Sequence, residues 1–294
     1  MNTAAVGQHC PECAGAGRRS QRPVRTIFGG TLAGQHGHVT KILIGINVAV
    51  AVLAIAIGGS QAIGGGGLGG LLGGNTPLHY WGAMVAGFPG EPTTYVAEGS
   101  REVLGTADGV VNGDYYRLLT STFLHYGIVH LVLNMWALWV VGGALEPLLG
   151  RVRFLALYLV SGLGGSVAVY LTAGMDVQLF GNRPLFGEVE SLTAGASGAV
   201  FGLFGAFYVV LRRMRRDTSG ITVLLAINLI FTLTVPGISV AGHLGGLATG
   251  ALAALGLAYA PRQHRTIIQV GTIAGLALLL LVLTLARTAS LTAG

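Results

Sequence analysis

Seven long apolar runs dominate the sequence and constrain its fold more than any other feature. Most come close to the roughly 20 residues that an α-helix needs to cross about 30 Å of hydrocarbon. The runs cover residues 42–58, 126–145, 154–172, 194–211, 221–235, 240–260 and 267–286. Only 10% of the residues are charged, against about a quarter in soluble proteins. The sequence therefore predicts an all-α polytopic membrane protein.

The basic residues give the chain a predicted orientation. Of the 17 lysines and arginines, 13 fall in segments that lie on one side of the predicted membrane. They are Arg18, Arg19, Arg22, Arg25, Lys41, Arg151, Arg153, Arg212, Arg213, Arg215, Arg216, Arg262 and Arg265. The positive-inside rule makes that side cytoplasmic. We therefore expect a multi-pass protein of the cell membrane, with its N-terminus inside and its C-terminus outside. The net charge of +6 then reflects orientation in the lipid bilayer, and no nucleic-acid partner is expected.

The runs divide the chain into five predicted regions. Residues 1–40 form a basic cytoplasmic tail and 41–58 the first transmembrane helix, which we interpret as retained because no cleavage signal follows it. Residues 59–115 form an external loop, glycine-rich and flexible at first and then interfacial, with a helix expected within 76–88. Residues 116–260 hold the core helices, and 261–294 hold a seventh transmembrane helix and a short C-terminus.

Polar side chains inside a bilayer are costly, so they are the first candidates for function. In the core helices they are His125, His130, Asn134, Ser197, Asn228 and His243. Ser197 and His243 each lie a few residues into a run that enters from the outer side. A rise of 1.5 Å per residue places both roughly 5 to 8 Å below the outer boundary. They are therefore predicted to lie at the same depth.

Glycine spacing indicates that these two runs also pack closely. Each run has a row of glycines three or four residues apart, which we call its glycine ridge. The ridges are Gly198, Gly202 and Gly205 on one run, and Gly242, Gly246 and Gly250 on the other. Small residues at this spacing let helix backbones approach one another. The alternative is that both ridges serve packing alone and that Ser197 is one more small interface residue. Matched depth favours a Ser197–His243 pair.

A serine beside a neutral imidazole is a nucleophile with its general base. No acid lies within either run, so the prediction is a dyad rather than a triad. His130 and Asn134, spaced i and i+4, share a helix face and are expected to assist an oxyanion, together with the backbone N–H of Gly198. The alternative for His130 and Asn134 is an interhelical hydrogen-bond pair. His125 at the mouth of its run is predicted to be a structural hydrogen-bonding residue.

The ordered set of motifs resembles the rhomboid intramembrane serine proteases over residues 80–260. It comprises Tyr116-Arg117, then His125, His130 and Asn134, then Gly142-Gly143-Ala144-Leu145-Glu146 and Gly150, then Gly195-Ala196-Ser197-Gly198, and finally Ala241-Gly242-His243-Leu244-Gly245-Gly246-Leu247. The resemblance implies a six-helix bundle with one extra C-terminal helix and a water-filled cavity open to the outside. It also implies cleavage of single-span transmembrane substrates near the outer face of their transmembrane segment.

The same resemblance assigns roles to individual residues. Ser197 would be the nucleophile and His243 the general base and acid. Arg117 and Glu146 would brace the first external loop and the end of the second span. Many members carry a tyrosine four residues after the serine, packed on the histidine, and this chain has Phe201 there. The ring contact is expected to persist, without the hydroxyl.

The cytoplasmic segment 1–40, which we call the leader, carries the chain's two cysteines. We expect no disulfide between them, because the cytoplasm is reducing. His9-Cys10-Pro11-Glu12-Cys13 resembles a fragment of the zinc-binding leader of some bacterial rhomboids. A closed zinc site needs four ligands, so His9, Cys10 and Cys13 would require His36 or His38 as well. We expect no cofactor, with zinc as the alternative.

Two other functions compete with proteolysis. A catalytically weak or inactive relative would bind transmembrane helices without cutting them. A solute or proton carrier would use His125, His130 and His243 as a relay, but it would lack the intramembrane carboxylates that such relays often contain.

Overall fold

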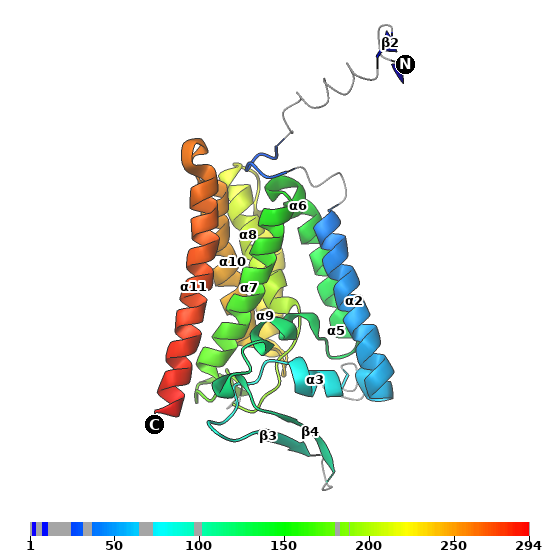
Figure 1. Cartoon of the computed structure of the whole chain (residues 1–294), viewed down its shortest axis with the longest axis vertical. Coiled ribbons are helices and arrows are strands. Elements are labelled where there is room, and N and C mark those ends of the chain that lie inside the picture. Colours follow the sequence, from blue (N-terminus) through cyan, green and yellow to red (C-terminus); the bar gives the residue numbers. More distant parts are fainter. Residues whose placement is uncertain are drawn as a thin grey trace.

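A computed structural model describes residues 2–3, 8–10, 25–31, 37–64, 73–96, 102–179, 183–187 and 189–293. Its long helices run side by side in one bundle (Figure 1). They are α2 (His38–Gly58), α5 (Gly127–Ala137) with α6 (Gly143–Leu149), α7 (Arg151–Thr172), α8 (Ser197–Arg213), α9 (Ser219–Thr234), α10 (Val240–Tyr259) and α11 (Arg265–Thr292). A π-helical turn, η4 (Leu138–Gly142), joins α5 to α6. The predicted all-α polytopic bundle with an extra C-terminal helix is confirmed.

Five of the described helical segments are long and apolar enough to cross a membrane. They contain α2, α5 to α6, α7, α10 and α11. The helices α8 and α9 are shorter, at 17 and 16 residues. The predicted apolar runs thus correspond to the helices of the bundle.

Short elements fill the connections. They are β1 (Asn2–Thr3), β2 (Gln8–His9), η1 (Gly59–Ala62), α3 (Pro77–Gly82), β3 (Thr93–Val96), β4 (Val103–Ala107), η2 (Val110–Asn112), α4 (Arg117–Thr120), η3 (Ser121–Phe123), β5 (Gln178–Leu179), β6 (Arg183–Pro184) and η5 (Arg262–His264). The strands pair antiparallel as β1–β2, β3–β4 and β5–β6. In β3–β4, Thr93 faces Ala107 and Tyr95 faces Gly105.

The core of the bundle lies where α7, α8 and α10 pack together. Side chains such as Phe154, Tyr158, Leu203, Phe204 and Leu257 are buried there. α2 and α11 lie on opposite flanks (Figure 1), and most of their surface is not covered by protein. Apolar flanks of this kind fit a lipid surrounding.

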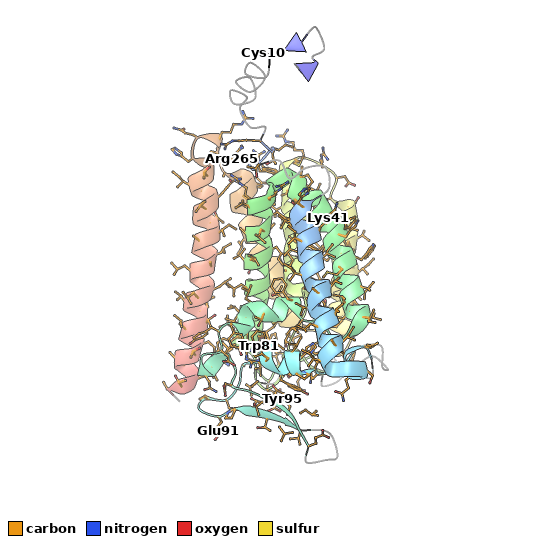
Figure 2. The ribbon with its side chains drawn as sticks, turned by 45° about the vertical axis from the view of Figure 1, so that its right-hand side comes forward. Cys10, Lys41, Trp81, Glu91, Tyr95 and Arg265 are labelled. Atoms are coloured by element: carbon orange, nitrogen blue, oxygen red, sulfur yellow. The ribbon has the colours of Figure 1, made fainter. Side chains whose placement is uncertain are left out.

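The two ends of the bundle differ in character (Figure 2). Lys41 and Arg265 lie at the end where the leader enters, whereas Trp81, Glu91 and Tyr95 lie at the other end. The hairpin β3–β4 covers this second end, which we call the hairpin end; the first is the basic end. The sequence predicted no hairpin here, because residues 93–107 alternate only weakly between polar and apolar side chains.

The leader and α2 also depart from the expected boundaries. Residues 25–31 do not form part of a loose tail: Phe28 is buried, and its carbonyl oxygen accepts a hydrogen bond of 3.1 Å from Gln269 Nε2. α2 begins at His38, ahead of its apolar run, because Glu146 caps it. The Glu146 carboxylate accepts from the Val39 N–H at 2.9 Å, and from the Thr40 N–H and hydroxyl at 2.8 and 2.9 Å.

Replacing Glu146 by glutamine is expected to lower the free energy of unfolding by about 2–3 kcal/mol, because a buried charged acceptor of three hydrogen bonds becomes a neutral amide. Thermal unfolding in detergent would measure the loss. Glu91→Gln is the matched control, since Glu91 is exposed at the hairpin end. Equal stability of the two variants would show that the cap is dispensable.

Candidate active site

Ser197 is the first residue of α8, and a set of hydrogen bonds fixes the chain that leads to it. The Gly195 N–H donates to the Ser121 carbonyl oxygen at 2.9 Å, and the Ala196 N–H donates to His125 Nε2 at 3.4 Å. Two residues before Gly195 in the sequence, Thr193 exchanges backbone hydrogen bonds of 2.9 and 2.8 Å with Met84. The segments on either side of α4 therefore hold the start of α8 in place.

Gly195 allows a histidine ring to lie beside Ser197. Its φ of 141° lies in a region that side chains disfavour. A Cβ built on it would come within 2.9 Å of His130 Nε2 and 3.5 Å of Ser197 Oγ. Only a residue without a side chain leaves room for the imidazole of His130. The structure thus brings His130 close to Ser197; its role as an assisting group stays a prediction.

The hydrogen bonding of His130 identifies which ring nitrogen carries its proton. Nδ1 accepts from the Tyr126 N–H at 3.3 Å. In a neutral imidazole the other nitrogen is then the donor. The Nε2–H of His130 is therefore the donor on the Ser197 side of the ring.

His243 lies in the first turn of α10, at the same level as Ser197. Its ring stacks on Phe201, with ring centroids 4.0 Å apart and an interplanar angle of 17°. A Cβ at Gly198 would lie 3.3 Å from the Gly242 carbonyl oxygen, so the two backbones touch beside the serine and the histidine. The expected ring contact of Phe201 is present.

Thr232 on α9 holds His243 from the other side, and the sequence analysis did not identify it. Thr232 Oγ1 lies 2.7 Å from His243 Nδ1 and donates its own proton to the Asn228 carbonyl oxygen at 2.7 Å. A threonine hydroxyl has one proton, so Oγ1 must accept from Nδ1–H. The lone pair of His243 is therefore on Nε2. No sequence signal marked Thr232, since hydroxyl residues are common in membrane helices.

Ser197 and His243 are neighbours without a direct bond. In the part of the chain that the structure describes, no hydrogen bond joins Ser197 Oγ to His243 Nε2. Catalytic hydrogen bonds are often loose in ligand-free sites and tighten when substrate binds.

Asn134 and Gly198 are predicted as further hydrogen-bond donors. Asn134 lies one turn further along α5, and its Nδ2 donates to the His130 carbonyl oxygen at 3.0 Å. One amide N–H of Asn134 remains for another acceptor. Gly198 is in the first turn of α8, where backbone N–H groups have no intrahelical partners. α5 thus carries both His130 and Asn134, one turn apart, and α8 begins with Ser197 and Gly198.

His125 and Arg117, two further predicted residues, make structural contacts with backbone groups around the site. Burial, and secondarily His130, lower the pKa of His125 to about 3, so His125 is a neutral acceptor for Ala196. Arg117 pairs with Asp114 at 2.6 Å and donates to the carbonyl oxygens of Tyr80 and Ala83 at 2.9 and 3.1 Å. Arg117 thus holds α3 to α4 at the hairpin end. Glu146 lies at the basic end, away from Ser197.

The possible zinc ligands cannot be compared as a set. Cys10 is exposed, whereas Cys13 and His36 lie outside the described residues, as does the side chain of His9. Among the residues that are described, no cluster of three or more His, Cys, Asp or Glu side chains is arranged to hold a metal.

Comparison with known proteins adds to this geometry. The sequence model of the rhomboid domain matches residues 112–260, which is half of the chain. The chain belongs to the rhomboid family. This rhomboid is 43% identical over 171 residues to the rhomboid protease GluP of Bacillus subtilis, a match that covers 56% of the chain and 30% of GluP. It is 35% identical over 155 residues to YdcA of the same organism, covering 51% of the chain and 71% of YdcA.

A more distant relative extends the comparison to another genus. This rhomboid is 28% identical over 173 residues to the rhomboid protease AarA of Providencia stuartii, a match that covers 53% of the chain and 60% of AarA. The chain spans less than two thirds of GluP and of AarA. Both relatives are named rhomboid proteases, and the family and the apolar helices support a multi-pass membrane protein.

Replacing Phe201 by leucine is expected to lower kcat about two- to tenfold, because a stacked aromatic pair contributes about 0.5–1.5 kcal/mol to holding the His243 ring. Phe201→Tyr keeps the ring and is the control. Initial rates on a single-span substrate would measure both. A leucine variant as fast as the tyrosine variant would show that stacking does not position His243.

Proposed function

We propose that this rhomboid is an intramembrane serine endopeptidase that cleaves single-span transmembrane proteins near the outer face of their transmembrane segment. The observation that carries the proposal is the pair of histidine orientations beside Ser197. His243 presents a lone pair at Nε2, and His130 presents an N–H. A nucleophilic serine needs one base and one oxyanion donor, and these two rings supply them.

The proposed reaction proceeds in two stages. Ser197 Oγ attacks the peptide carbonyl carbon while its proton passes to His243 Nε2. The tetrahedral oxyanion takes hydrogen bonds from His130 Nε2–H, the Gly198 N–H and the free amide N–H of Asn134. The C–N bond then breaks, and His243 returns the proton to the leaving amine. Water, deprotonated by His243, cleaves the acyl-enzyme and regenerates Ser197.

The location of the site supports cleavage from one side of the membrane. Ser197 and His243 lie in the first turns of helices that begin at the hairpin end, and the basic residues gather at the other end. We infer from the positive-inside rule that the site opens to the extracytoplasmic side of the cell membrane. Substrates would reach it laterally from the bilayer.

Co-expression with a tagged single-span substrate tests the proposal. Ser197→Ala and His243→Ala should each abolish cleavage, and Thr234→Val, an exposed change on α9, should not. Labelling of Ser197 by a fluorophosphonate probe separates an active protease from a relative that only binds transmembrane helices. Cleavage that survives both alanine variants would refute the proposal.

A further inference from the structure

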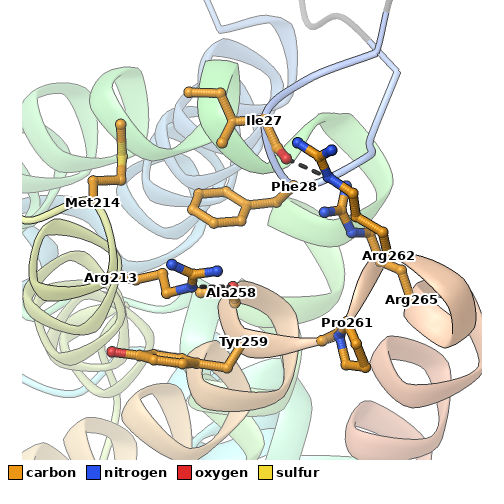
Figure 3. Close-up of a pocket in the computed structure, with 10 residues that line it drawn as sticks. Ile27, Phe28, Arg213, Met214, Ala258, Tyr259, Pro261, Arg262 and Arg265 are labelled. Carbon is orange, nitrogen blue, oxygen red and sulfur yellow. Dashed lines mark hydrogen bonds between the residues drawn. The ribbon is translucent and has the colours of Figure 1, made fainter.

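A cavity lies at the basic end of the bundle, away from Ser197 (Figure 3). Its volume is about 360 Å³. The last turns of α8 and α10, the turn that follows α10 and the start of α11 form its walls, and Ile27 and Phe28 of the leader cover it. It therefore lies where four separate parts of the chain meet at the predicted membrane boundary.

The charge around this cavity is entirely positive. Arg213, Arg262 and Arg265 line it, and none of its described lining residues is acidic. In Figure 3, Arg213 approaches from one side and Arg262 with Arg265 from the other. Three guanidinium groups around one small space repel one another unless an anion lies between them.

Within the described ranges, most of the guanidinium N–H groups of these three arginines have no protein acceptor. Arg213 lies over the Tyr259 ring at 5.2 Å and donates one hydrogen bond, from Nε to the Ala258 carbonyl oxygen at 3.2 Å. Arg265 donates one, from Nη1 to the Ile27 carbonyl oxygen at 3.3 Å. Arg262 donates none within the described part of the chain. Each guanidinium has five N–H donors, so donors remain on all three arginines.

Apart from Tyr259, the other side chains that line the cavity are apolar. Phe28, Met214 and Pro261 line the cavity together with the arginines. A ligand that complements both the arginines and the apolar lining has a phosphate at one end and hydrocarbon at the other. Guanidinium groups bind phosphate with paired hydrogen bonds. Basic pockets between transmembrane helices at a membrane surface suit anionic headgroups.

We propose that this cavity binds the phosphate headgroup of an anionic phospholipid. Arg213, Arg262 and Arg265 hold the phosphate oxygens, and the first methylenes of the lipid lie along Phe28 and Met214. Binding also stabilises the docked leader, because Arg265 contacts Ile27 and a Cβ at Gly29 would lie 2.9 Å from the Arg265 side chain. The site thus couples the lipid composition of the membrane to the position of the leader.

The test uses the full chain in nanodiscs of phosphatidylcholine, with and without phosphatidylglycerol. We expect phosphatidylglycerol to raise the melting temperature, and native mass spectrometry to find it retained on the protein. The double variant Arg262→Gln/Arg265→Gln should lose this rise and weaken retention by about tenfold or more. Arg212→Gln/Arg216→Gln is the matched control, because it removes the same charge at the same end of the bundle outside the cavity lining.

Three results would overturn the proposal. One is an equal loss in both double variants, which would indicate general surface charge. Another is full retention of phosphatidylglycerol by Arg262→Gln/Arg265→Gln. The third is a rise of the same size on adding inorganic phosphate to phosphatidylcholine nanodiscs, which would make free phosphate rather than a lipid the ligand. If a double variant does not fold, its two single variants are tested in its place, and only their retention of phosphatidylglycerol is measured.

Discussion

Thr232→Val is expected to lower kcat about a hundredfold, the size of a typical general-base contribution. Valine has the shape of threonine but cannot accept the Nδ1–H of His243, so the ring is no longer held in the orientation that puts its lone pair on Nε2. Thr232 is buried behind His243, so we expect it not to contact substrate and KM to change little. Initial rates in proteoliposomes over a range of substrate concentrations would separate kcat from KM.

Two further variants distinguish positioning from packing. Thr232→Ser keeps the hydroxyl and should recover most of the rate. Thr234→Val removes a hydroxyl of the same helix that bonds only to the Ile230 carbonyl oxygen, and it should be silent. If Thr232→Ser were as slow as Thr232→Val, the methyl group rather than the hydrogen bond would matter. An unchanged rate of fluorophosphonate labelling in Thr232→Val would likewise count against the positioning role.

Gly246→Ala is expected to disturb both stability and activity. A Cβ at Gly246 would overlap the carbonyl oxygen of Gly198, the residue next to Ser197. Overpacking of this kind costs about 1–3 kcal/mol. The strain is relieved only if α8 and α10 separate, which moves His243 away from Ser197. A displacement of about 1 Å can lower a rate by about a hundredfold.

The matched control for Gly246→Ala is Gly275→Ala on α11. A Cβ at Gly275 would meet nothing within 4 Å, so this change should leave the melting temperature and the cleavage rate as they are. Melting temperature and cleavage of the folded fraction would be measured for both variants. If Gly246→Ala behaved like Gly275→Ala, the close contact of α8 and α10 would not be needed for the site.

The features that could be predicted from the sequence are those that depend on a repeating residue pattern or on the depth of a residue in the membrane. Apolar length identified the bundle, and arginine placement gave Ser197 and His243 a common level. The glycine ridges then indicated which two helices touch, and Gly198 does lie against Gly242. These predictions needed only positions along a helix axis.

The contacts that could not be predicted from the sequence depend on how a helix is rotated about its axis, or on partners far away along the chain. Thr232 reaches His243 because of how α9 is turned toward α10, which no spacing within α9 reveals. Glu146 was expected to brace its own span, but it caps α2 from 107 positions away along the chain. The docking of Phe28 on Gln269 joins segments 241 residues apart. Such contacts follow from the assembled bundle.

The opposite proton positions of His130 and His243 mean that the resting site contains no permanent ion. With both rings neutral, one offers hydrogen and the other a lone pair, and the described residues add no carboxylate contact to His243. In the proposed reaction, proton transfer creates an imidazolium and an oxyanion together, a few ångströms apart, and collapse of the intermediate removes both. The site around Ser197 therefore does not have to stabilise a lone charge during the proposed reaction. The only ion pair that the site holds lasts as long as the tetrahedral intermediate.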